Sequence, residues 1–377
     1  MDSSGRKVTT SLERQERKRR SRQEDADDAG ITLRPLVPPG ERAAQFWPVQ
    51  SFERDFRFIK PLGTGTFGKV TLCRYLGTGQ LCAVKRVLKA HVLRFKQEVR
   101  LLNERACLRA FDSPFVVRYY ASFSDADHLF FCLEYLPGGE LFTRIHTAKR
   151  GDGKHGLKPS HARFYAAEVI LALEYLHSWH VLYRDLKPEN VLLDAEGHVR
   201  LVDLGFACQT ATRSYSVVGT TEYLSPEIVL GRGINTGGDW WAVGILIFEM
   251  LCGYTPFKAS TKMACYQRII HDELVFPSDW PSRSGKALVR ALLQKQSFER
   301  LGVTNGGVKL IKQHEFFESI DWDELARRAA TPPWHPRCAN LEDTRHFHTD
   351  GQDFDDPDIN IGDLNLAPEE LSIFDGF

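Results

Sequence analysis

The chain has 377 residues and carries 49 acidic and 49 basic side chains, so its formal net charge at pH 7 is zero. This length exceeds the size at which one hydrophobic core keeps growing, and we expect two lobes with appendages. The balanced charge gives no reason to expect nucleic acid as the main partner. No apolar run reaches the length of a membrane span, so none is predicted.

Eight cysteines are scattered without CxxC pairs, which indicates neither a disulfide framework nor a zinc site. A reducing compartment, and therefore a cytoplasmic location, is expected. Residues 1–45 alternate acidic and basic clusters with few apolar side chains, which predicts disorder. The basic run at 17–20 is either a nuclear-import signal or a solvated run of charges. We favour the second, and a nuclear location stays open.

From residue 56 the chain changes to short β-branched and aromatic runs separated by glycine turns, which predict strands. A helical period follows over residues 95–109, with Val99, Leu102 and Ala106 as its apolar face. The predicted strands are residues 58–62, 69–75, 81–87, 116–123, 129–135 and 199–202.

The run Pro-Gly-Gly at 137–139 breaks this pattern and is the predicted hinge between two lobes. Beyond it the chain is mainly helical, and a Gly- and Lys-rich solvent loop is expected around 149–158. The predicted helices are residues 160–178, 239–251, 263–271 and 285–293.

The first chemical motif lies between the first two predicted strands, where residues 63–70 read GTGTFGKV and fit G-x-G-x-x-G-x-V. Glycines let the backbone approach a phosphate closely, so that its N–H groups can cover it. A dinucleotide-binding fingerprint would require a helix directly afterwards, and here a strand follows. In the next strand, Lys85 is placed to reach phosphates. Glu104, on the following helix, is its candidate partner.

The second motif is the run YRDLKPEN at 183–190, which places an acid, a base and an amide in one loop. These groups can align a hydroxyl, neutralise a moving phosphoryl group and hold a metal ion. Asp203 follows the strand at 199–202 in a DLG run, and its carboxylate together with Asn190 suits Mg²⁺. Glu227 follows in an SPE run, with Arg300 as its expected buried partner.

In this order the motifs of residues 56–317 resemble a protein kinase domain. The YRD variant, the DWWA run at 239–242 and a tail ending in Phe-x-x-Phe are similar to the AGC group, above all to catalytic subunits of cAMP-dependent protein kinases. The resemblance implies an α+β bilobal fold, with a β-rich small lobe, a helical large lobe and a tail around the small lobe. The implied parts are a charged extension (1–50), the small lobe (51–136), the large lobe (137–317) and the tail (318–377).

The resemblance also implies ATP and Mg²⁺ as cofactors and assigns roles to individual residues. Asp185 would orient the substrate hydroxyl and accept its proton, and Lys187 would stabilise the transferring phosphoryl group. Lys85, paired with Glu104, would position ATP, while Asn190 and Asp203 would hold Mg²⁺. The implied nucleotide-binding set is Leu62, Gly63, Thr64, Gly65, Thr66, Phe67, Gly68, Val70, Ala83, Lys85, Leu133, Glu134, Leu136, Glu140, Leu192 and Phe347.

Three acids match those that bind arginines upstream of the phosphoacceptor in this group: Glu140, Glu189 and Glu249. Taken singly, each would more often be a structural or surface acid. Together they favour an Arg-rich Ser/Thr protein substrate by charge complementarity. The predicted function is therefore a basophilic serine/threonine protein kinase. The alternative is a pseudokinase-like scaffold that binds nucleotide, but such proteins normally lack Lys85, Asp185 or Asp203 equivalents.

Regulation is predicted at two places. Ser216 aligns with the activation-loop phosphosite, where its phosphate would pair with Arg184 and Arg100, although Cys208 replaces a further lysine of the family. Phe374 and Phe377 are expected to dock in a groove of the small lobe. An upstream activating kinase and a cyclic-nucleotide-binding regulatory subunit are left open, and the catalytic unit is expected to be a monomer.

Three residues depart from the family pattern. Leu204 replaces a phenylalanine and should preserve the packing. Thr221 replaces a proline, which leaves the peptide-binding loop less rigid, and Ser225 replaces an alanine. These departures suggest a divergent member of the group.

Overall fold

The computed structural model describes residues 46–64, 68–149, 153, 155–209, 219–233, 235–347 and 371–377, all within the compact unit 41–377. The predicted disorder of residues 1–45, three residues of the glycine loop (Gly65, Thr66 and Phe67) and Ser216 lie outside these ranges. The same holds for most of the acidic tail.

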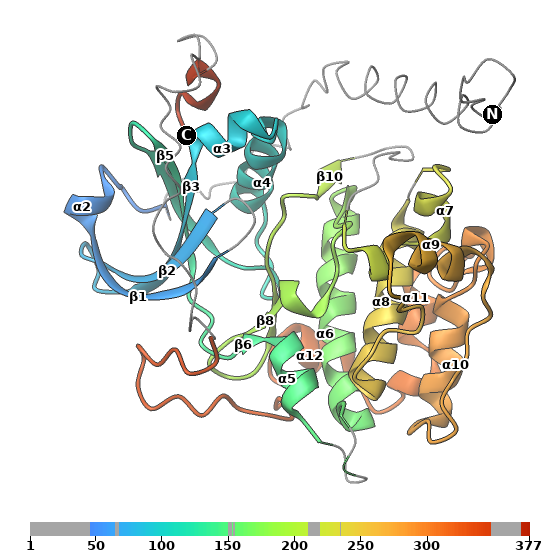
Figure 1. Ribbon diagram of the computed structural model, residues 1–377. Helices are drawn as coiled ribbons and strands as arrows, with labels where there is room; N and C mark the ends of the chain where they lie inside the picture. Colours follow the sequence, from blue (N-terminus) through green and yellow to red (C-terminus); the bar gives the residue numbers. More distant parts are fainter. Residues whose placement is uncertain are drawn as a thin grey trace, which may run out of the picture. The chain divides into compact units, whose positions relative to one another are not determined.

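The small lobe is built on a five-stranded antiparallel sheet in the order β1-β2-β3-β5-β4 (Figure 1). β3 lies in its middle, paired with β2 on one side and β5 on the other, so that Lys85 is held between Val70 and Phe131. The strands are β1 (Phe56–Thr64), β2 (Gly68–Tyr75), β3 (Leu81–Leu88), β4 (Tyr119–Ser124) and β5 (His128–Glu134).

Short helices and one long helix flank this sheet. α2 (Phe52–Asp55) begins at Ser51, whose side chain accepts the N–H of Arg54. Between β3 and β4 lie α3 (Lys89–Arg94) and α4 (Glu98–Ala110). Trp47 stacks between Tyr75 and Tyr120, with ring centroids 4.2 and 4.3 Å apart, and anchors the segment before β1 to the sheet.

The predicted apolar face of α4 was wrong. Val99 is 53% exposed, and the buried side of the helix instead carries Leu101, Glu104 and Leu108. The buried stripe includes a carboxylate because Lys85 neutralises it, and an apolar pattern search passes over such a position. α3 was also missed, because the predicted helix begins at residue 95 and α3 ends at Arg94.

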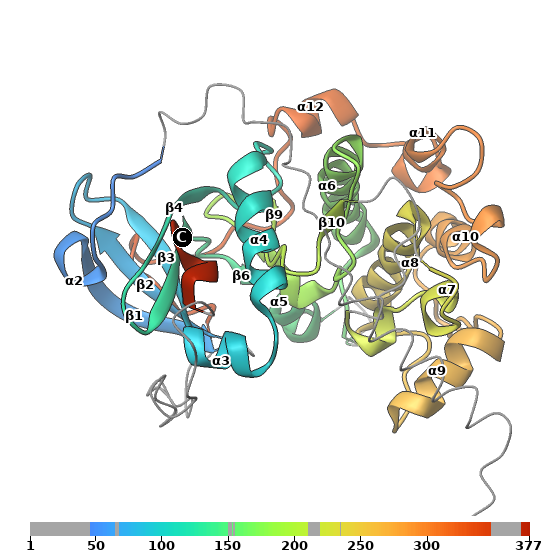
Figure 2. The same cartoon turned by 90° about the horizontal axis from the view of Figure 1, so that it is seen from above.

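The large lobe packs around two long helices, α6 (Pro159–Ser178) and α8 (Thr236–Cys252), which lie side by side in Figures 1 and 2. Nearly all of α8 is buried, which explains its apolar sequence. Asn235 caps its start, and Gly253 ends it with a φ of 77°, a backbone conformation that favours glycine. The other helices are α5 (Leu141–Thr147), α7 (Pro226–Val229), α9 (Lys262–His271), α10 (Arg283–Leu292), α11 (Val308–Lys312) and α12 (Trp322–Ala326).

Two small sheets and several 3₁₀ turns carry the loops with chemical motifs. One sheet has the order β6-β8-β9 and the other joins β10 to β7. The elements are β6 (Gly139–Glu140), β7 (Val181–Leu182), β8 (Val191–Leu193), β9 (Val199–Leu201), β10 (Cys208–Gln209), η2 (Pro188–Asn190), η3 (Thr221–Tyr223), η4 (Ser297–Glu299), η5 (Glu315–Phe317) and η7 (Ser372–Phe374).

The structure confirms the predicted α+β bilobal fold. The six predicted strands and the four predicted helices of the large lobe are present, with ends shifted by a few residues. Glu227 and Arg300 form the expected ion pair, at 2.6 Å, with the arginine fully buried. Leu204 is fully buried too. Among the described residues, no helix is both long and apolar enough to span a membrane.

Candidate active site

Asp239 on α8 holds the loop at 183–190 through hydrogen bonds to its main chain. The carboxylate of Asp239 accepts the main-chain N–H groups of Tyr183 (3.0 Å) and Arg184 (2.9 Å), and it lies 2.7 Å from Nε2 of His177. Arg184 has a φ of 68°, an uncommon conformation for a residue with a side chain. The buried carboxylate of Asp239 accepts both N–H groups and so stabilises this turn. It thereby fixes the main-chain direction at Asp185, the next residue.

Asp185 is buried, and both its carboxylate oxygens are hydrogen-bonded. Oδ2 accepts from Nζ of Lys187 (3.0 Å) and Nδ2 of Asn190 (2.8 Å). Oδ1 accepts from the main-chain N–H of Thr220 (3.1 Å) and from its hydroxyl (3.3 Å). Four donors from two loops therefore orient this carboxylate. A carboxylate that aligns a substrate hydroxyl must be fixed in this way.

Lys85 and Glu104 form an ion pair, with Nζ 2.6 Å from Oε1. Burial alone would lower the pKa of Lys85, but the negative charges of Glu104 and Asp203 raise it above its usual value. The lysine is therefore held as a cation within β3, the central strand of the small-lobe sheet. A fixed cation in a buried site is suited to phosphate binding.

Asp203 follows β9 in a left-handed conformation, with a φ of 53°. Its Oδ1 accepts the N–H of Gly205 (3.1 Å) and lies 3.8 Å from a guanidinium nitrogen of Arg100. Burial raises the pKa of Asp203, but Lys85 and Arg100 outweigh it, so the pKa lies below the usual value. The carboxylate therefore stays ionised at neutral pH.

These donors fit Mg²⁺, which prefers a few carboxylate and amide oxygens and shares the remaining positions with phosphates and water. The amide nitrogen of Asn190 bonds the main-chain oxygen of Asp185 (2.9 Å) as well as its carboxylate, which leaves the amide oxygen as a ligand. Asp203 supplies an ionised carboxylate. When bound, the metal ion would neutralise negative charge on the phosphates of ATP.

The residues assigned to the nucleotide come from both lobes. Leu62, Gly63 and Thr64 end β1, Gly68 and Val70 lie on β2, Ala83 on β3, Leu133 and Glu134 on β5, Leu136 directly after β5, and Leu192 on β8. Phe347 lies beside Tyr135 at the hinge, with ring centroids 6.0 Å apart. The tail approaches the hinge so closely that a Cβ at Gly139 would lie 2.6 Å from the carbonyl oxygen of His346.

Two of the three candidate substrate acids repel each other. Burial and the negative charge of Glu189 raise the pKa of Glu140 to about 7, although Lys187 opposes the shift. Burial, with a contribution from Glu249, raises the pKa of Glu189 as well. Glu249 differs, because its carboxylate accepts the hydroxyl of Tyr223 (2.5 Å) and lies 3.2 Å from Nε2 of His146.

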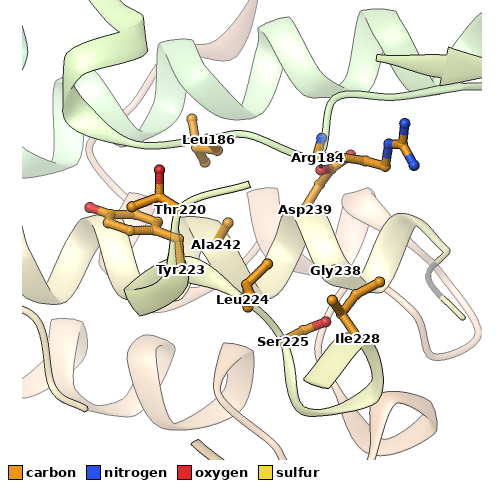
Figure 3. Close-up of a pocket in the computed structure, with 10 residues that line it drawn as sticks. All are labelled: Arg184, Leu186, Thr220, Tyr223, Leu224, Ser225, Ile228, Gly238, Asp239 and Ala242. Carbon is orange, nitrogen blue, oxygen red and sulfur yellow. Dashed lines mark hydrogen bonds between the residues drawn. The ribbon is translucent and has the colours of Figure 1, made fainter. Parts of the chain in front are cut away.

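A small cavity of about 20 Å³ lies beneath the segment that leads from Thr220 to α7 (Figure 3). It has room for about one water molecule. The Ser225 hydroxyl at this site is buried and has no hydrogen-bond partner among the described residues. The lining residues are Arg184, Leu186, Thr220, Tyr223, Leu224, Ser225, Ile228, Gly238, Asp239 and Ala242.

The two arginines assigned to the activation loop converge on Phe206. The guanidinium of Arg100 lies 3.6 Å from the centre of its ring, and Nε of Arg184 donates to its carbonyl oxygen (2.6 Å). Both cations therefore lie at the start of the segment that carries Ser216, which is itself outside the described residues. The structure places both arginines at Phe206. Their contact with a phosphate on Ser216 stays a prediction.

The end of the tail lies against the small lobe, where η7 is next to α4 and β4 (Figure 2). Phe374 and Phe377 are buried, and the Phe377 ring meets the Phe131 ring edge-on at 5.1 Å. The main-chain oxygen of Phe377 accepts from Arg105 on α4 (2.7 Å) and from Ser122 on β4 (2.9 Å). The tail thus braces the helix that carries Glu104.

Sequence reasoning gave no role to several residues that the fold brings to the site. Thr220 and Asp239 act on the loop 183–190 from 35 and 55 residues away, and Tyr223 and His146 surround Glu249. The GT run at 219–220 and the DWWA run were visible in the sequence. Their contacts were not, because they depend on how the two segments pack.

Comparison with known proteins agrees with this geometry. A model of the protein kinase domain matches residues 56–317. The human cAMP-dependent protein kinase catalytic subunit PRKX is 39% identical over 314 residues, covering 83% of this chain and 86% of the human protein. Cyclic AMP-dependent protein kinase type 3 of Saccharomyces cerevisiae is 39% identical over 282 residues, covering 75% and 69%.

The catalytic subunit of Dictyostelium discoideum is also 39% identical, over 302 residues, which cover 80% of this chain and 46% of that protein. The identity extends over most of the chain, and the residues that phosphoryl transfer needs are present and correctly grouped. The chain therefore belongs to the protein kinase family, as an AGC-type serine/threonine kinase that uses ATP and Mg²⁺ and is related to the catalytic subunits of cAMP-dependent protein kinases.

Proposed function

We propose that this kinase phosphorylates serine or threonine in Arg-rich protein substrates and is activated by phosphorylation at Ser216. In the transfer step, Asp185 orients the substrate hydroxyl and accepts its proton. Lys187 and Lys85 stabilise negative charge on the phosphates from two sides. The four donors around Asp185 reduce the reorganisation that this alignment requires.

The substrate preference rests on one observation, the raised pKa values of Glu140 and Glu189. Two carboxylates that repel each other in a half-buried place are stabilised when a cation enters between them. A guanidinium suits such a place because it is always charged and can bond both carboxylates at once. The pair therefore favours a peptide with arginine before the phosphoacceptor.

A test uses two peptides that differ only by arginine or alanine before the serine. Wild-type enzyme should prefer the arginine peptide, and Glu189→Gln should raise KM for that peptide by roughly 10-fold, the effect of about 1.4 kcal/mol. KM for the alanine peptide and for ATP should not change. Equal KM values for the two peptides with wild-type enzyme would contradict the proposed preference.

Activation at Ser216 is supported by Arg100 and Arg184, which stand together at Phe206. A phosphate between two guanidinium groups would be held by charge-assisted hydrogen bonds. Ser216→Ala should therefore lower kcat strongly, whereas the neighbouring Ser214→Ala should leave it unchanged. Full activity of the Ser216→Ala enzyme would exclude this regulation.

We also propose that the tail supports activity by bracing α4. Phe377→Ala removes the contact with Phe131 and should lower both Tm and kcat, since Glu104 on α4 must stay beside Lys85. Ile373→Ala is the matched control, because Ile373 is 43% exposed in the same segment. If both variants behave like wild type, the tail contributes nothing to activity.

A further inference from the structure

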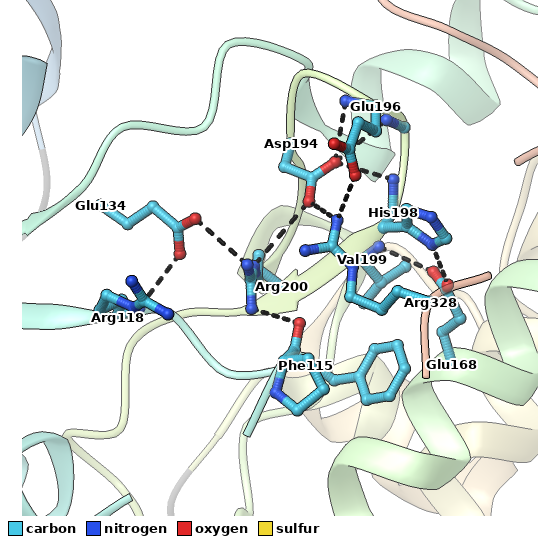
Figure 4. A network of polar contacts seen from close by, with 12 residues as sticks. Phe115, Arg118, Glu134, Glu168, Asp194, Glu196, His198, Val199, Arg200 and Arg328 are labelled. Carbon is cyan, nitrogen blue, oxygen red and sulfur yellow. Dashed lines mark hydrogen bonds and ion pairs between the residues drawn. The ribbon is translucent and has the colours of Figure 1, made fainter. Parts of the chain in front are cut away.

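We call β5 the hinge strand, because it leads into the hinge at 137–139. A network of charged side chains lies where this strand meets the large lobe (Figure 4). At its centre is Arg200 on β9, whose side chain is only 9% exposed. One of its guanidinium nitrogens lies 3.2 Å from the carboxylate of Glu134, at the end of β5. Another donates to the carbonyl oxygen of Pro114, in the loop between α4 and β4. One large-lobe side chain thus binds two small-lobe segments.

An acidic side chain of the large lobe lies near the same guanidinium, although Nε of Arg200 has no hydrogen-bond partner among the described residues. Asp194, between β8 and β9, lies 4.0 Å from Nε of Arg200 and pairs with Arg328, which follows α12. Arg328 also contacts Glu196 at 3.1 Å. The other oxygen of Asp194 accepts three main-chain N–H groups of its own turn. Asp194 is therefore held in place independently of Arg200 and forms a fixed base for it.

Main-chain bonds run parallel to this ionic link. Leu201 donates to the carbonyl oxygen of Phe115 (2.8 Å) and accepts from the N–H of Val117 (2.9 Å), so β9 already touches the small-lobe loop. These bonds attach the loop at 115–117 to β9, and the main-chain N–H of Glu134 in turn donates to the carbonyl oxygen of Arg118 (2.9 Å). Arg200 adds a second attachment, at Glu134. The Arg200 side chain is 9% exposed and that of Glu134 is 20% exposed, so solvent and salt screen this ion pair less than a surface pair.

We propose that Arg200 is a positioning residue that fixes the hinge strand against β8 and β9 and thereby sets the affinity for ATP. The elements that it joins carry residues assigned to ATP or to its metal ion: Glu134 on β5, Leu192 on β8, and Asp203 shortly after β9. The proposal rests on that assignment, and it requires no contact between Arg200 and ATP. Loss of the link would widen the range of lobe positions and weaken ATP binding, while the groups around Asp185 keep their geometry.

The test compares KM for ATP, KM for peptide and kcat, together with ATP binding measured directly by calorimetry. Arg200→Met keeps much of the side-chain volume but removes the guanidinium, and should raise Kd and KM for ATP roughly 3- to 10-fold. KM for peptide and kcat should stay within about twofold of wild type. Glu134→Gln, at a partly exposed carboxylate, should shift Kd and KM in the same direction and remains available if Arg200→Met folds poorly.

A double variant and a control decide the interpretation. Arg200→Met combined with Glu134→Gln should be no worse than the more severe single variant, because both remove the same interaction. Lys312→Met breaks a 2.6 Å ion pair with Glu174 far from the nucleotide and should leave ATP affinity unchanged. A fall in Tm with unchanged ATP affinity in the Arg200 and Glu134 variants would overturn the proposal, as would full additivity. Failure of the proposed peptide preference would alter only peptide KM, so the two ideas can be separated.

Discussion

Asp185 and the candidate substrate acids are carboxylates of one candidate site, in opposite electrostatic situations. Asp185 is surrounded by donors from Lys187, Asn190 and Thr220. Glu140 and Glu189 are half-buried beside each other, and Lys187 only partly offsets their repulsion. The first carboxylate is held by donors without substrate, whereas the proposed role of the second pair is to receive a cation that relieves its repulsion.

The strongest test of this difference is Asp185→Asn. The amide keeps the size and can still accept the N–H of Thr220, but it cannot take a proton, so kcat should fall about 10²- to 10⁴-fold. ATP affinity should change little, because Lys85 and Asp203 remain. The control is Asp272→Asn, at an exposed residue of the large lobe, which should leave kcat unchanged. A fully active Asp185→Asn enzyme would mean that the donors around this carboxylate serve only the fold.

The next effect concerns pH. The pKa of Glu140 is raised from 4.5 to about 7, so its carboxylate becomes charged as the pH rises through neutrality. KM for an arginine peptide should therefore fall between pH 6 and pH 8. A raised folded-state pKa also means that the group contributes stability at low pH, which is lost as the pH rises through about 7. The contribution of Glu140 to Tm should therefore decrease between about pH 4.5 and pH 7, the interval between the unfolded and folded pKa values.

The matched variant is Glu140→Gln, which should flatten both profiles. It should also weaken the dependence of Tm on pH between about pH 4.5 and pH 7, because the neutral amide does not repel Glu189. Peptide KM and Tm that depend on pH equally in wild type and variant would assign the titration to another group.

The smallest expected effect lies at Thr220. Thr220→Val preserves the shape and the main-chain donor but removes the 3.3 Å hydroxyl bond to Asp185. A neutral donor of this kind contributes about 0.5–1 kcal/mol, so kcat should fall two- to fivefold. Thr220→Ser keeps the hydroxyl and should behave like wild type. If valine and serine give the same kcat, the main-chain N–H alone is sufficient.

Much of the site could be predicted from the sequence because its groups are close along the chain. Asp185, Lys187 and Asn190 lie within six residues, and a loop of that length brings them together wherever it is placed. The pairing of Lys85 with Glu104 was also predicted, from opposite charges on a strand and the following helix, although the sequence alone does not select the helix face. The predicted strands and large-lobe helices follow in the same way from local periodicity.

Long-range packing decided the rest. Val99 is exposed and Glu104 is buried because the position of β3, and not the apolar pattern of α4, selects the face of that helix. Asp239 holds Tyr183 and Arg184 only because α8 packs beneath their loop. Arg200 joins three chain segments whose sequences show no common pattern. Functional groups that lie close along the chain can be predicted from the sequence. Burial and charge pairing between distant segments exist only once the lobes have folded together.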